Sequence, residues 1–575
     1  MNYILTNKDN NYKSENLKEY ILKLRGIKDP QKYLHLNKDA SIPFDKLDNI
    51  QEGVKCLIKH IDNNNDIYIQ IDNDVDGICS ATMLYNYLKK ICKNNIFYGI
   101  GEGKTHGINA NYIIKTYPNV KLVLIPDAGS NQIIEHKALY DKGIDTICLD
   151  HHNTKEISKY AIIINNQISQ SYLNKQFCGT GIVYKFLQAL DQELWENHAD
   201  DDIDLLALSL ISDMMDIREY ETKYYIDIGL KNVKNKMFKT MLLKQGYSMN
   251  YNVTPINIAF YIVPLINSFI RYNPMQDKIK LFKVFADIDT DHEYEHRTRK
   301  KDDNGNPIIE MENTYEYMTR KCVNAHSKQY REKNKIKKII IEDINKLQIY
   351  KNKIIIYNVT GIARQTLTGL LANDIAQYYN KPCVLLRNIK DDLFGGSGRN
   401  IDSVDLPNLQ QFLLSSKLFN FVEGHENAHG VNINKENINK LIKFSNNKLK
   451  NISFIKRLDF CIPFEELTDD FIETIDEMSN LWGQYLKEPI IEITNVYASV
   501  DDINLIGKKK NTLKFESEDI SFIKFNSTNE EYENLVGGWD SNEKLVNLNV
   551  IGTCGINKYN GKETLQINIK DYEKI

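Results

Sequence analysis

Three aspartates, Asp72, Asp74 and Asp76, alternate along one short stretch of the chain and are followed by Gly77. In an extended segment, alternate side chains point the same way. Their carboxylates would repel one another unless a cation lies between them. An apolar run at residues 67–71 precedes the stretch and predicts a buried strand, and apolar residues recur at helical spacing after it. The sequence therefore predicts a metal-binding turn between a strand and a helix.

Two other interpretations of this turn are a solvated acidic turn and a calcium loop. An EF-hand loop also begins Asp-x-Asp-x-Asp-Gly, but it needs a bidentate Glu at its twelfth position and a helix before it. Counting from Asp72, the twelfth residue is Met83, and a strand pattern comes before. The calcium-loop interpretation fails on both counts.

Further polar residues follow other strand-like apolar runs. The runs at residues 122–125, 146–149, 161–164 and 205–211 precede, in that order, Asp127, the triplet Asp150-His151-His152, Asn165 and Asp213. Strands that alternate with helical segments predict a parallel sheet, and ligands bind at the carboxyl ends of its strands. Imidazole and carboxylate together suit manganese or zinc, and the excess of carboxylates favours manganese or magnesium.

Length and composition predict several domains in a reducing compartment. At 575 residues the chain should contain three or four domains of roughly 150 residues. The net charge of −4 does not exclude nucleic-acid binding, because only a local basic surface is needed. No apolar run approaches the ~18 residues of a membrane span. Residues 1–8 show no basic segment followed by an apolar one, so secretion is not expected. The nine cysteines are scattered and form no Cys-x-x-Cys, so we expect a cytoplasmic protein.

In order and spacing, these motifs resemble those of the DHH phosphoesterase family. Within that family the chain is more similar to the RecJ-type exonucleases specific for single-stranded DNA than to the members that act on small substrates. Residues 98–107 resemble the RecJ-type segment between the first two motifs, and residues 178–185 resemble its glycine-bearing helix start. The resemblance extends over nearly the whole chain.

The resemblance implies two divalent cations, Mn²⁺ or alternatively Mg²⁺, with Asp127 as the bridge. The implied ligands are Asp74, Asp76, Asp127, His151 and Asp213. It also implies that His152 contacts the scissile phosphate or acts as an acid. Asp150 would orient a histidine, and Asp72 would contact the ligand residues without binding a cation itself. Gln70 stands where the family often has histidine, which predicts a weaker hold on one cation.

A second α/β unit is expected after a connecting segment. Residues 246–345 are polar and should end in a long helix over 320–346, whose basic face is either solvated or in contact with DNA. Strands are predicted at 354–357 and 383–386, on either side of a helix at 366–379. Glycine-bearing stretches at 393–400 and 424–430 are predicted to be loops.

These two stretches resemble the DHH-associated domain, which implies that four of their residues hold the nucleic-acid backbone. The four are Ser397, Arg399, Gly424 and His425. A guanidinium such as that of Arg399 can grip a phosphate in bidentate fashion. Two positions depart from the family pattern. Arg364 stands where RecJ-type chains usually have histidine, and Glu423 replaces a glycine.

The tail predicts a small β-barrel. Leu565, Ile567 and Ile569 alternate with polar residues, and Asn560-Gly561 is a strong hairpin signal. The triplet Lys508, Lys509 and Lys510 should lie in a turn. The tail resembles an OB-fold, which offers a basic groove and stacking surfaces to single strands. A barrel that only packs on its neighbours is the alternative.

The expected fold class is α/β, with two α/β lobes joined by a long helix and a C-terminal OB-fold barrel. The expected domains are an N-terminal segment with the DHH domain (1–245), the connecting segment (246–345), the DHH-associated domain (346–450), and a linker with the OB-fold (451–575). The chain would be a monomer without membrane contact. Its expected partners are single-stranded DNA and, as candidates, a helicase or a single-strand-binding protein.

The expected activity is a manganese-dependent exonuclease for single-stranded DNA in recombination, repair or replication. The resemblance implies 5′-to-3′ polarity and mononucleotide products. One alternative is a DHH phosphodiesterase of short oligoribonucleotides or cyclic dinucleotides, whose members generally lack a C-terminal OB-fold. Another is a non-catalytic scaffold that binds single strands at replication, but such proteins lose metal ligands that this chain retains.

Overall fold

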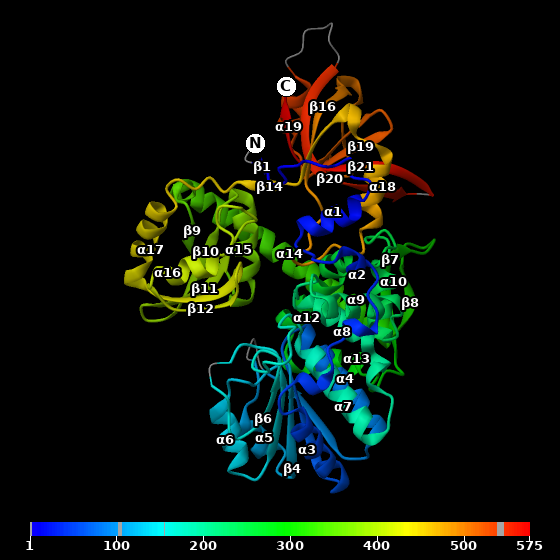
Figure 1. Ribbon diagram of the computed structural model, residues 1–575, viewed down its shortest axis with the longest axis vertical. Helices are drawn as coiled ribbons and strands as arrows, with labels where there is room; N and C mark the ends of the chain where they lie inside the picture. The colour runs from blue at the N-terminus through cyan, green and yellow to red at the C-terminus, as the bar shows by residue number, and fades with distance from the viewer. Residues whose placement is uncertain (1–2, 102–105, 155, 538–544, 560) are drawn as a thin grey trace. The chain divides into compact units, whose positions relative to one another are not determined.

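The computed structural model describes residues 3–101, 106–154, 156–537, 545–559 and 561–575 (Figure 1). These residues form two compact units. The first unit comprises residues 1–21, 328–477 and 488–575, and the second comprises residues 22–327 and 478–487. Among the residues described, no helix combines the length and the apolar composition that crossing a membrane requires.

The second unit contains the predicted parallel sheet. Its strands are β2 (Asp66–Ile71), β3 (Ile96–Ile100), β4 (Val120–Pro126), β5 (Asp145–Asp150) and β6 (Ile162–Asn165), in the spatial order β3-β2-β4-β5-β6. Every neighbouring pair runs parallel. Strand β4 is buried at all but one position, as expected of a strand covered on both faces.

Helices cover both faces of this sheet (Figure 1). Helices α5 (Ala110–Thr116) and α6 (Ile133–Tyr140) pack on one face, around a cluster that includes Tyr68, Val123 and Cys148. Helices α3 (Ile50–Asp62), α4 (Val75–Ile91) and α7 (Gly179–Leu194) lie on the other side and contact one another as well as the strands. The carboxyl ends of the parallel strands therefore share one edge, where the predicted site residues follow.

Further helices complete the second unit. They are α2 (Pro30–Leu34), α8 (Ile203–Ser212), α9 (Tyr220–Lys231), α10 (Lys236–Gln245), α11 (Pro255–Asn257), the π-helix η4 (Ile258–Ile262), α12 (Val263–Tyr272) and α13 (Met275–Phe285). The prediction of a strand at residues 205–211 was wrong, because this segment is helix α8. A continuous apolar run fits a buried helix as well as a buried strand.

The connecting segment contains more structure than the sequence predicted. Strands β7 (Glu293–Lys301) and β8 (Pro307–Asn313) form an antiparallel hairpin where no strand was expected. Glu312 of β8 accepts hydrogen bonds from Arg320 Nε at 3.0 and 2.8 Å, which anchors the hairpin to the next helix. That helix, α14 (Thr314–Lys346), is the predicted long helix, and it begins six residues earlier than expected.

The first unit contains a five-stranded sheet of order β12-β13-β11-β10-β9. Its elements are β9 (Ile355–Asn358), α15 (Gln365–Tyr379), β10 (Cys383–Lys390), β11 (Leu393–Arg399), α16 (Leu409–Ser415), β12 (Phe419–His425), β13 (Ala428–Asn434) and α17 (Lys435–Lys448). The strands and helix predicted at 354–386 are confirmed. The two glycine-bearing stretches were wrongly predicted to be loops, since they form β11 and the β12–β13 hairpin.

The tail of the first unit forms a seven-stranded sheet of order β15-β16-β20-β21-β19-β18-β17. The strands are β15 (Phe460–Pro463), β16 (Ile491–Ser499), β17 (Asn504–Ile506), β18 (Thr512–Ser517), β19 (Ile520–Phe525), β20 (Leu545–Tyr559) and β21 (Lys562–Lys574), with α18 (Asp469–Glu477) against β20. Ile567 and Ile569 are buried on β21, as their alternation predicted. Pairing between the outer strands β15 and β17, which would close a barrel, is not seen among the described residues. Asn560 lies outside them.

Candidate metal centre

The aspartate turn is fixed by hydrogen bonds at the start of helix α4. Strand β2 ends at Ile71, and Asp74 is the N-cap of α4, where its Oδ1 accepts a hydrogen bond from Gly77 N at 2.9 Å. A side chain at position 77 could not be accommodated, because a Cβ there would lie 2.5 Å from the Cβ of Asp72. The chain therefore needs glycine directly after the three aspartates.

Asp76 is held by residues from two distant helices. Its carboxylate accepts hydrogen bonds from Gly179 N (2.7 Å) and Thr180 N (2.8 Å) at the start of α7, and from Ser209 Oγ (2.6 Å) on α8. Burial would raise the pKa of Asp76, but His151 and these hydrogen bonds outweigh it and hold the pKa below its ordinary value. Asp76 is therefore held as a charged carboxylate in a buried place.

His151 lies among three carboxylates. Its Nε2 is 3.2 Å from Asp127 Oδ1, 3.5 Å from Asp213 Oδ2 and 3.8 Å from Asp76 Oδ2. These four residues come from the ends of β4, β5 and α8 and from the first turn of α4. The structure thus brings together four of the five predicted ligands, and Asp74 adjoins them in the same turn.

Two of these oxygens indicate that a cation belongs here. Asp127 Oδ1 and Asp213 Oδ2 are buried and lack a hydrogen-bond partner among the described residues. Burial, together with the charges of Asp76 and Asp74, raises the pKa of both carboxyl groups well above the ordinary range. Bringing these carboxylates together without a counter-charge costs free energy, because they repel one another. A divalent cation would bind their oxygens and offset the repulsion. The donor set of imidazole and carboxylates fits manganese or magnesium.

Asp150 connects the metal-site loop to the exposed His152. Its Oδ1 lies 2.8 Å from Nδ1 of His152 and accepts hydrogen bonds from the amides of His151 (2.7 Å) and His152 (3.1 Å). Burial lowers the pKa of His152, but the hydrogen bond and charge of Asp150 outweigh it and raise this pKa to about 10. Asn165 Nδ2 also donates to His152 O at 2.9 Å. The geometry is that predicted for an orienting carboxylate.

His106 was not predicted as a site residue, although it lies beside the aspartate turn. Its Nδ1 is 2.6 Å from Oδ2 of Asp72, whose Oδ1 accepts a hydrogen bond from Gly107 N at 3.1 Å. Ligand atoms of Asp72, Asp74 and His106 lie within 4.8 Å of one another, so they form a second group suited to a cation. Gln70, by contrast, is buried and donates to Ile71 O at 3.0 Å. The imidazole nearest to the aspartate turn on this side is therefore that of His106 and not a residue at position 70.

Two basic residues beside the turn were also missed, because they lie in the predicted connecting segment. Lys278 Nζ on α13 donates to Asn73 Oδ1 at 2.7 Å. Arg271 is the next-to-last residue of α12. Burial lowers the pKa of its guanidinium, and the charge of Asp74 in the aspartate turn opposes this effect. Only the surrounding fold reveals these residues, since nothing in their local sequence distinguishes them from surface cations.

A third group, Cys56, His60 and Asp145, offers ligand atoms at the opposite edge of the sheet. Here Asp145 Oδ2 already contacts Lys59 Nζ at 3.0 Å and His60 Nε2 at 2.9 Å. Because His60 Nδ1 accepts a hydrogen bond from Asn65 Nδ2 at 3.0 Å, its Nε2 carries the proton. These groups satisfy one another without a cation.

The predicted phosphate-binding residues of the first unit lie on its five-stranded sheet. Ser397 and Arg399 occupy β11, and Gly424 (φ 127°) and His425 end β12. Gly369 on α15 makes room for the guanidinium, since a Cβ there would lie 2.7 Å from Arg399 Nη2. Strand β13 lies between β11, which carries Ser397 and Arg399, and β12, which carries Gly424 and His425, and is hydrogen-bonded to both.

The remaining predicted residues are the three lysines of the tail. Lys508, Lys509 and Lys510 are exposed in the turn between β17 and β18, as expected. Arg364, which departs from the family pattern, pairs with Glu332 at 2.9 Å. The residues 102–105 in the RecJ-type segment lie outside the described part of the chain.

Comparison with known proteins agrees with this architecture. Residues 66–211 match the family model "DHH family, N-terminal domain", and residues 458–571 match "RecJ OB domain". The "Putative SPbeta prophage-derived single-strand DNA-specific exonuclease YorK" of Bacillus subtilis is 38% identical, over 99% of this chain and 97% of its own length. The single-stranded-DNA-specific exonuclease RecJ of Bacillus subtilis is 22% identical, over 94% of this chain and 65% of its own length.

A solved structure shows the same fold. The crystal structure of RecJ in complex with Mn²⁺ from Thermus thermophilus superposes with a TM-score of 0.69 at 14% identity, covering 99% of this chain and 78% of the other. The full-length similarity to YorK, the two matched domains and the clustered aspartates and histidine agree with one another. The chain belongs to the DHH family, among its RecJ-like members.

Proposed function

We propose that this protein is a metal-dependent exonuclease that hydrolyses the phosphodiester bonds of single-stranded DNA. The observation that carries the proposal is the placement of His151 Nε2 within 3.8 Å of three carboxylates, two of which have buried oxygens without a hydrogen-bond partner among the described residues. The names of its relatives support DNA as the substrate. The proposed cation is Mn²⁺, which the Thermus thermophilus RecJ structure contains. The family resemblance implies two ions per site.

The proposed cations would be held by Asp74, Asp76, Asp127, His151 and Asp213. Divalent cations supply Lewis acidity there, which lowers the pKa of water and stabilises charge on phosphoryl oxygens. The protein's own residues bind and orient the strand. His152, held as a cation by Asp150, donates a hydrogen bond to a phosphate oxygen or a proton to the leaving oxygen. Arg399 and Ser397 bind a phosphate of the backbone.

The finer features of the proposal rest on the family resemblance. They are 5′-to-3′ polarity, mononucleotide products, and a role in recombination, repair or replication. We also propose that the protein is a monomer and works in the cytoplasm, the location that its scattered cysteines favour. The described residues agree with a reducing compartment in one respect, since all nine cysteines are free thiols.

Digestion of end-labelled substrates tests the proposal. Single-stranded and duplex DNA and RNA, each labelled at the 5′ or the 3′ end, are incubated with the protein in Mn²⁺, in Mg²⁺ or in chelator. We expect rapid loss of the 5′ label from single-stranded DNA as mononucleotide, in Mn²⁺ and not in chelator. Hydrolysis that is confined to short oligoribonucleotides or cyclic dinucleotides would favour a small-substrate phosphodiesterase. Binding without hydrolysis would indicate a scaffold.

A further inference from the structure

Four aromatic side chains are exposed on two neighbouring elements of the second unit. Tyr247 and Tyr251 follow helix α10 and are 74% and 79% exposed, and Phe260 and Tyr261 of η4 are 71% and 38% exposed. Helix α10 and η4 contact each other. Tyr247, Tyr251 and Phe260 bury little apolar surface, so packing does not account for them, and Tyr261 presents part of its ring beside Phe260. We call these four residues the aromatic surface.

The segment that carries Tyr247 and Tyr251 is firmly held. Tyr251 N donates to Gly246 O at 2.8 Å, and a Cβ on Gly246 would lie 2.9 Å from the Tyr251 ring. Asn257 Nδ2 donates to the carbonyls of Met249 (3.2 Å) and Asn252 (2.7 Å), which ties the segment to α11 and η4. Tyr251 itself has φ 55°, a conformation that costs a non-glycine residue energy. The backbone that carries the rings of Tyr247 and Tyr251 is therefore held in place by hydrogen bonds.

The aromatic surface leads towards the metal centre. Helix α12 continues directly from η4, and Arg271 near its end comes eleven residues after Phe260, about 16 Å at the rise of an α-helix. Helix α12 contacts α4, the helix that begins at the aspartate turn. The next helix, α13, contributes Lys278, which bonds to Asn73 within that turn. One continuous run of helices thus connects the aromatic surface with the rim of the metal centre.

The charge of this region suits a polyanion. Residues 228–276 contain six basic residues and not one Asp or Glu. The chain has 77 acidic residues among 575, so a stretch of this length would hold about seven at the average frequency. Two of the six, Lys236 and Lys244, pair with Asp287 and Glu316 at 3.0 and 2.8 Å, so the excess of positive charge comes from the other four. Basic residues near exposed rings are the two features by which proteins bind single strands without sequence preference.

We propose that Tyr247, Tyr251, Phe260 and Tyr261 form a stacking surface for the unpaired bases of single-stranded nucleic acid that is fed to the metal centre. This inference rests on the proposed function and adds a binding site to it. The surface would hold the uncut strand through its bases, on the 3′ side of the phosphate being cut. Bases paired in a duplex are already stacked, so the surface would also favour single strands over duplexes.

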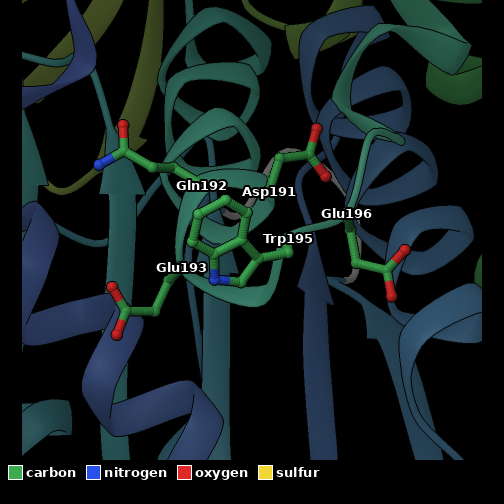
Figure 2. A pocket seen from close by; sticks show the side chains of 5 residues that line it. All are labelled: Asp191, Gln192, Glu193, Trp195 and Glu196. Carbon is green, nitrogen blue, oxygen red and sulfur yellow. The ribbon is translucent and has the colours of Figure 1, made fainter.

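An exposed aromatic residue elsewhere in the same unit provides a matched control. Trp195, 95% exposed, follows α7 at the end opposite Gly179, about 24 Å along the helix from the residues that bind Asp76. It borders a shallow concavity lined by Asp191, Gln192, Glu193 and Glu196 (Figure 2). This acidic setting repels a phosphate backbone, so Trp195→Ala removes a larger ring where no base is expected.

Binding of fluorescein-labelled oligothymidylate to the full-length protein in chelator tests the proposal, because hydrolysis is then prevented. Phe260→Ala and Tyr261→Ala should each weaken affinity roughly tenfold, and Trp195→Ala should leave it unchanged. Phe260→Leu should weaken affinity as much as Phe260→Ala, since leucine has no π-face, whereas Phe260→Trp should retain it. An oligonucleotide with abasic sites should bind the wild type more weakly, with little further loss in Phe260→Ala.

The outcomes separate this inference from the proposed function. Wild-type affinity in both Phe260→Ala and Tyr261→Ala would overturn the stacking surface, and so would full recovery in Phe260→Leu, which would indicate an apolar contact with the strand that needs no aromatic ring. If the wild type fails to degrade any single strand in Mn²⁺, the proposed function fails whatever the binding results. If it degrades strands and the aromatic variants bind normally, the stacking surface alone is wrong.

Discussion

Nδ1 of the half-exposed His152 lies 2.8 Å from Oδ1 of the buried Asp150. This pairing fixes the imidazole at the surface of the centre without using Asp150 as a cation ligand. Replacing the carboxylate with an amide should leave the ions bound but misdirect the ring. Asp150→Asn should lower kcat by about 10- to 100-fold with a small change in Mn²⁺ affinity. Steady-state kinetics and Mn²⁺ titration measure the two quantities. Equal loss of Mn²⁺ affinity would instead make Asp150 part of the ion site.

The crowding of Asp127 by other carboxylates predicts opposite effects of one substitution on stability and activity. Asp127→Asn should abolish hydrolysis, because the proposed bridging ligand is lost, while DNA binding remains measurable. In chelator the variant should melt at a higher temperature than the wild type, since a like charge has been removed from the cluster. Added Mn²⁺ should raise the Tm of the wild type and not of the variant. Near-normal turnover in Asp127→Asn would exclude the bridging role.

His106 should determine how many ions the centre holds. His106→Ala removes one member of the group with Asp72 and Asp74, so the variant should bind one Mn²⁺ tightly and the second at least tenfold more weakly. Counting bound Mn²⁺ by electron paramagnetic resonance gives the result directly, without relying on activity. His35→Ala, outside the site, is the control. Two tight ions in His106→Ala would leave His106 as a partner of Asp72 only.

Arg399 offers a test of the phosphate-binding strand. Arg399→Lys keeps the charge but loses the planar fork, so kcat/KM on long single strands should fall about tenfold or more. Gly369→Ala should act in the same direction, because its Cβ would fall 2.7 Å from Arg399 Nη2. Arg364→Lys, which alters another arginine of the same unit, is the matched control. Wild-type kinetics in Arg399→Lys would remove this residue from the substrate path.

The three lysines between β17 and β18 should contribute to the salt dependence of binding. Replacing Lys508, Lys509 and Lys510 with glutamine should flatten the slope of log affinity against log salt by about 0.7 for each phosphate that these lysines neutralise. Binding of long oligothymidylate at several salt concentrations measures this slope. Retained hydrolysis of very short oligonucleotides shows that the variant is folded. An unchanged slope would mean that the tail binds no phosphate through these residues.

The sequence predicted which residues cluster at the candidate metal centre better than it predicted the elements around them. The proximity of Asp74, Asp76, Asp127 and His151 could be predicted because each comes soon after a short apolar run that forms a buried strand of one parallel sheet. Asp213 was included although residues 205–211 form a helix and not the predicted strand. The prediction used only the position of Asp213 just after a buried apolar run, which holds for either kind of element. Hydrogen-bond donors such as Ser209 could not be found, since their role exists only when α7 and α8 meet at Asp76.

Glycine accounts for the main error in the first unit. The stretch at residues 393–400 was predicted to be a loop because glycine is common in turns. In the structure Gly396 and Gly398 lie within β11, where a Cβ would fall 2.0 Å from Leu385 O and 2.3 Å from the ring of His429. Glycine is required there by close packing against neighbouring strands, which local sequence does not reveal.

Gly77 and Gly179 occupy equivalent situations on two sides of the aspartate cluster. A Cβ at position 77 would strike Asp72, and one at position 179 would lie 2.4 Å from Asp127 Oδ1. Neither glycine offers a side chain to a cation or a substrate, yet any larger residue must push a carboxylate out of the cluster. The residue types at these two positions therefore indicate whether the carboxylates of a related chain can come together in the same way. In a relative that keeps every aspartate but carries a side chain at either position, we therefore expect the carboxylates to be displaced and catalysis to be lost.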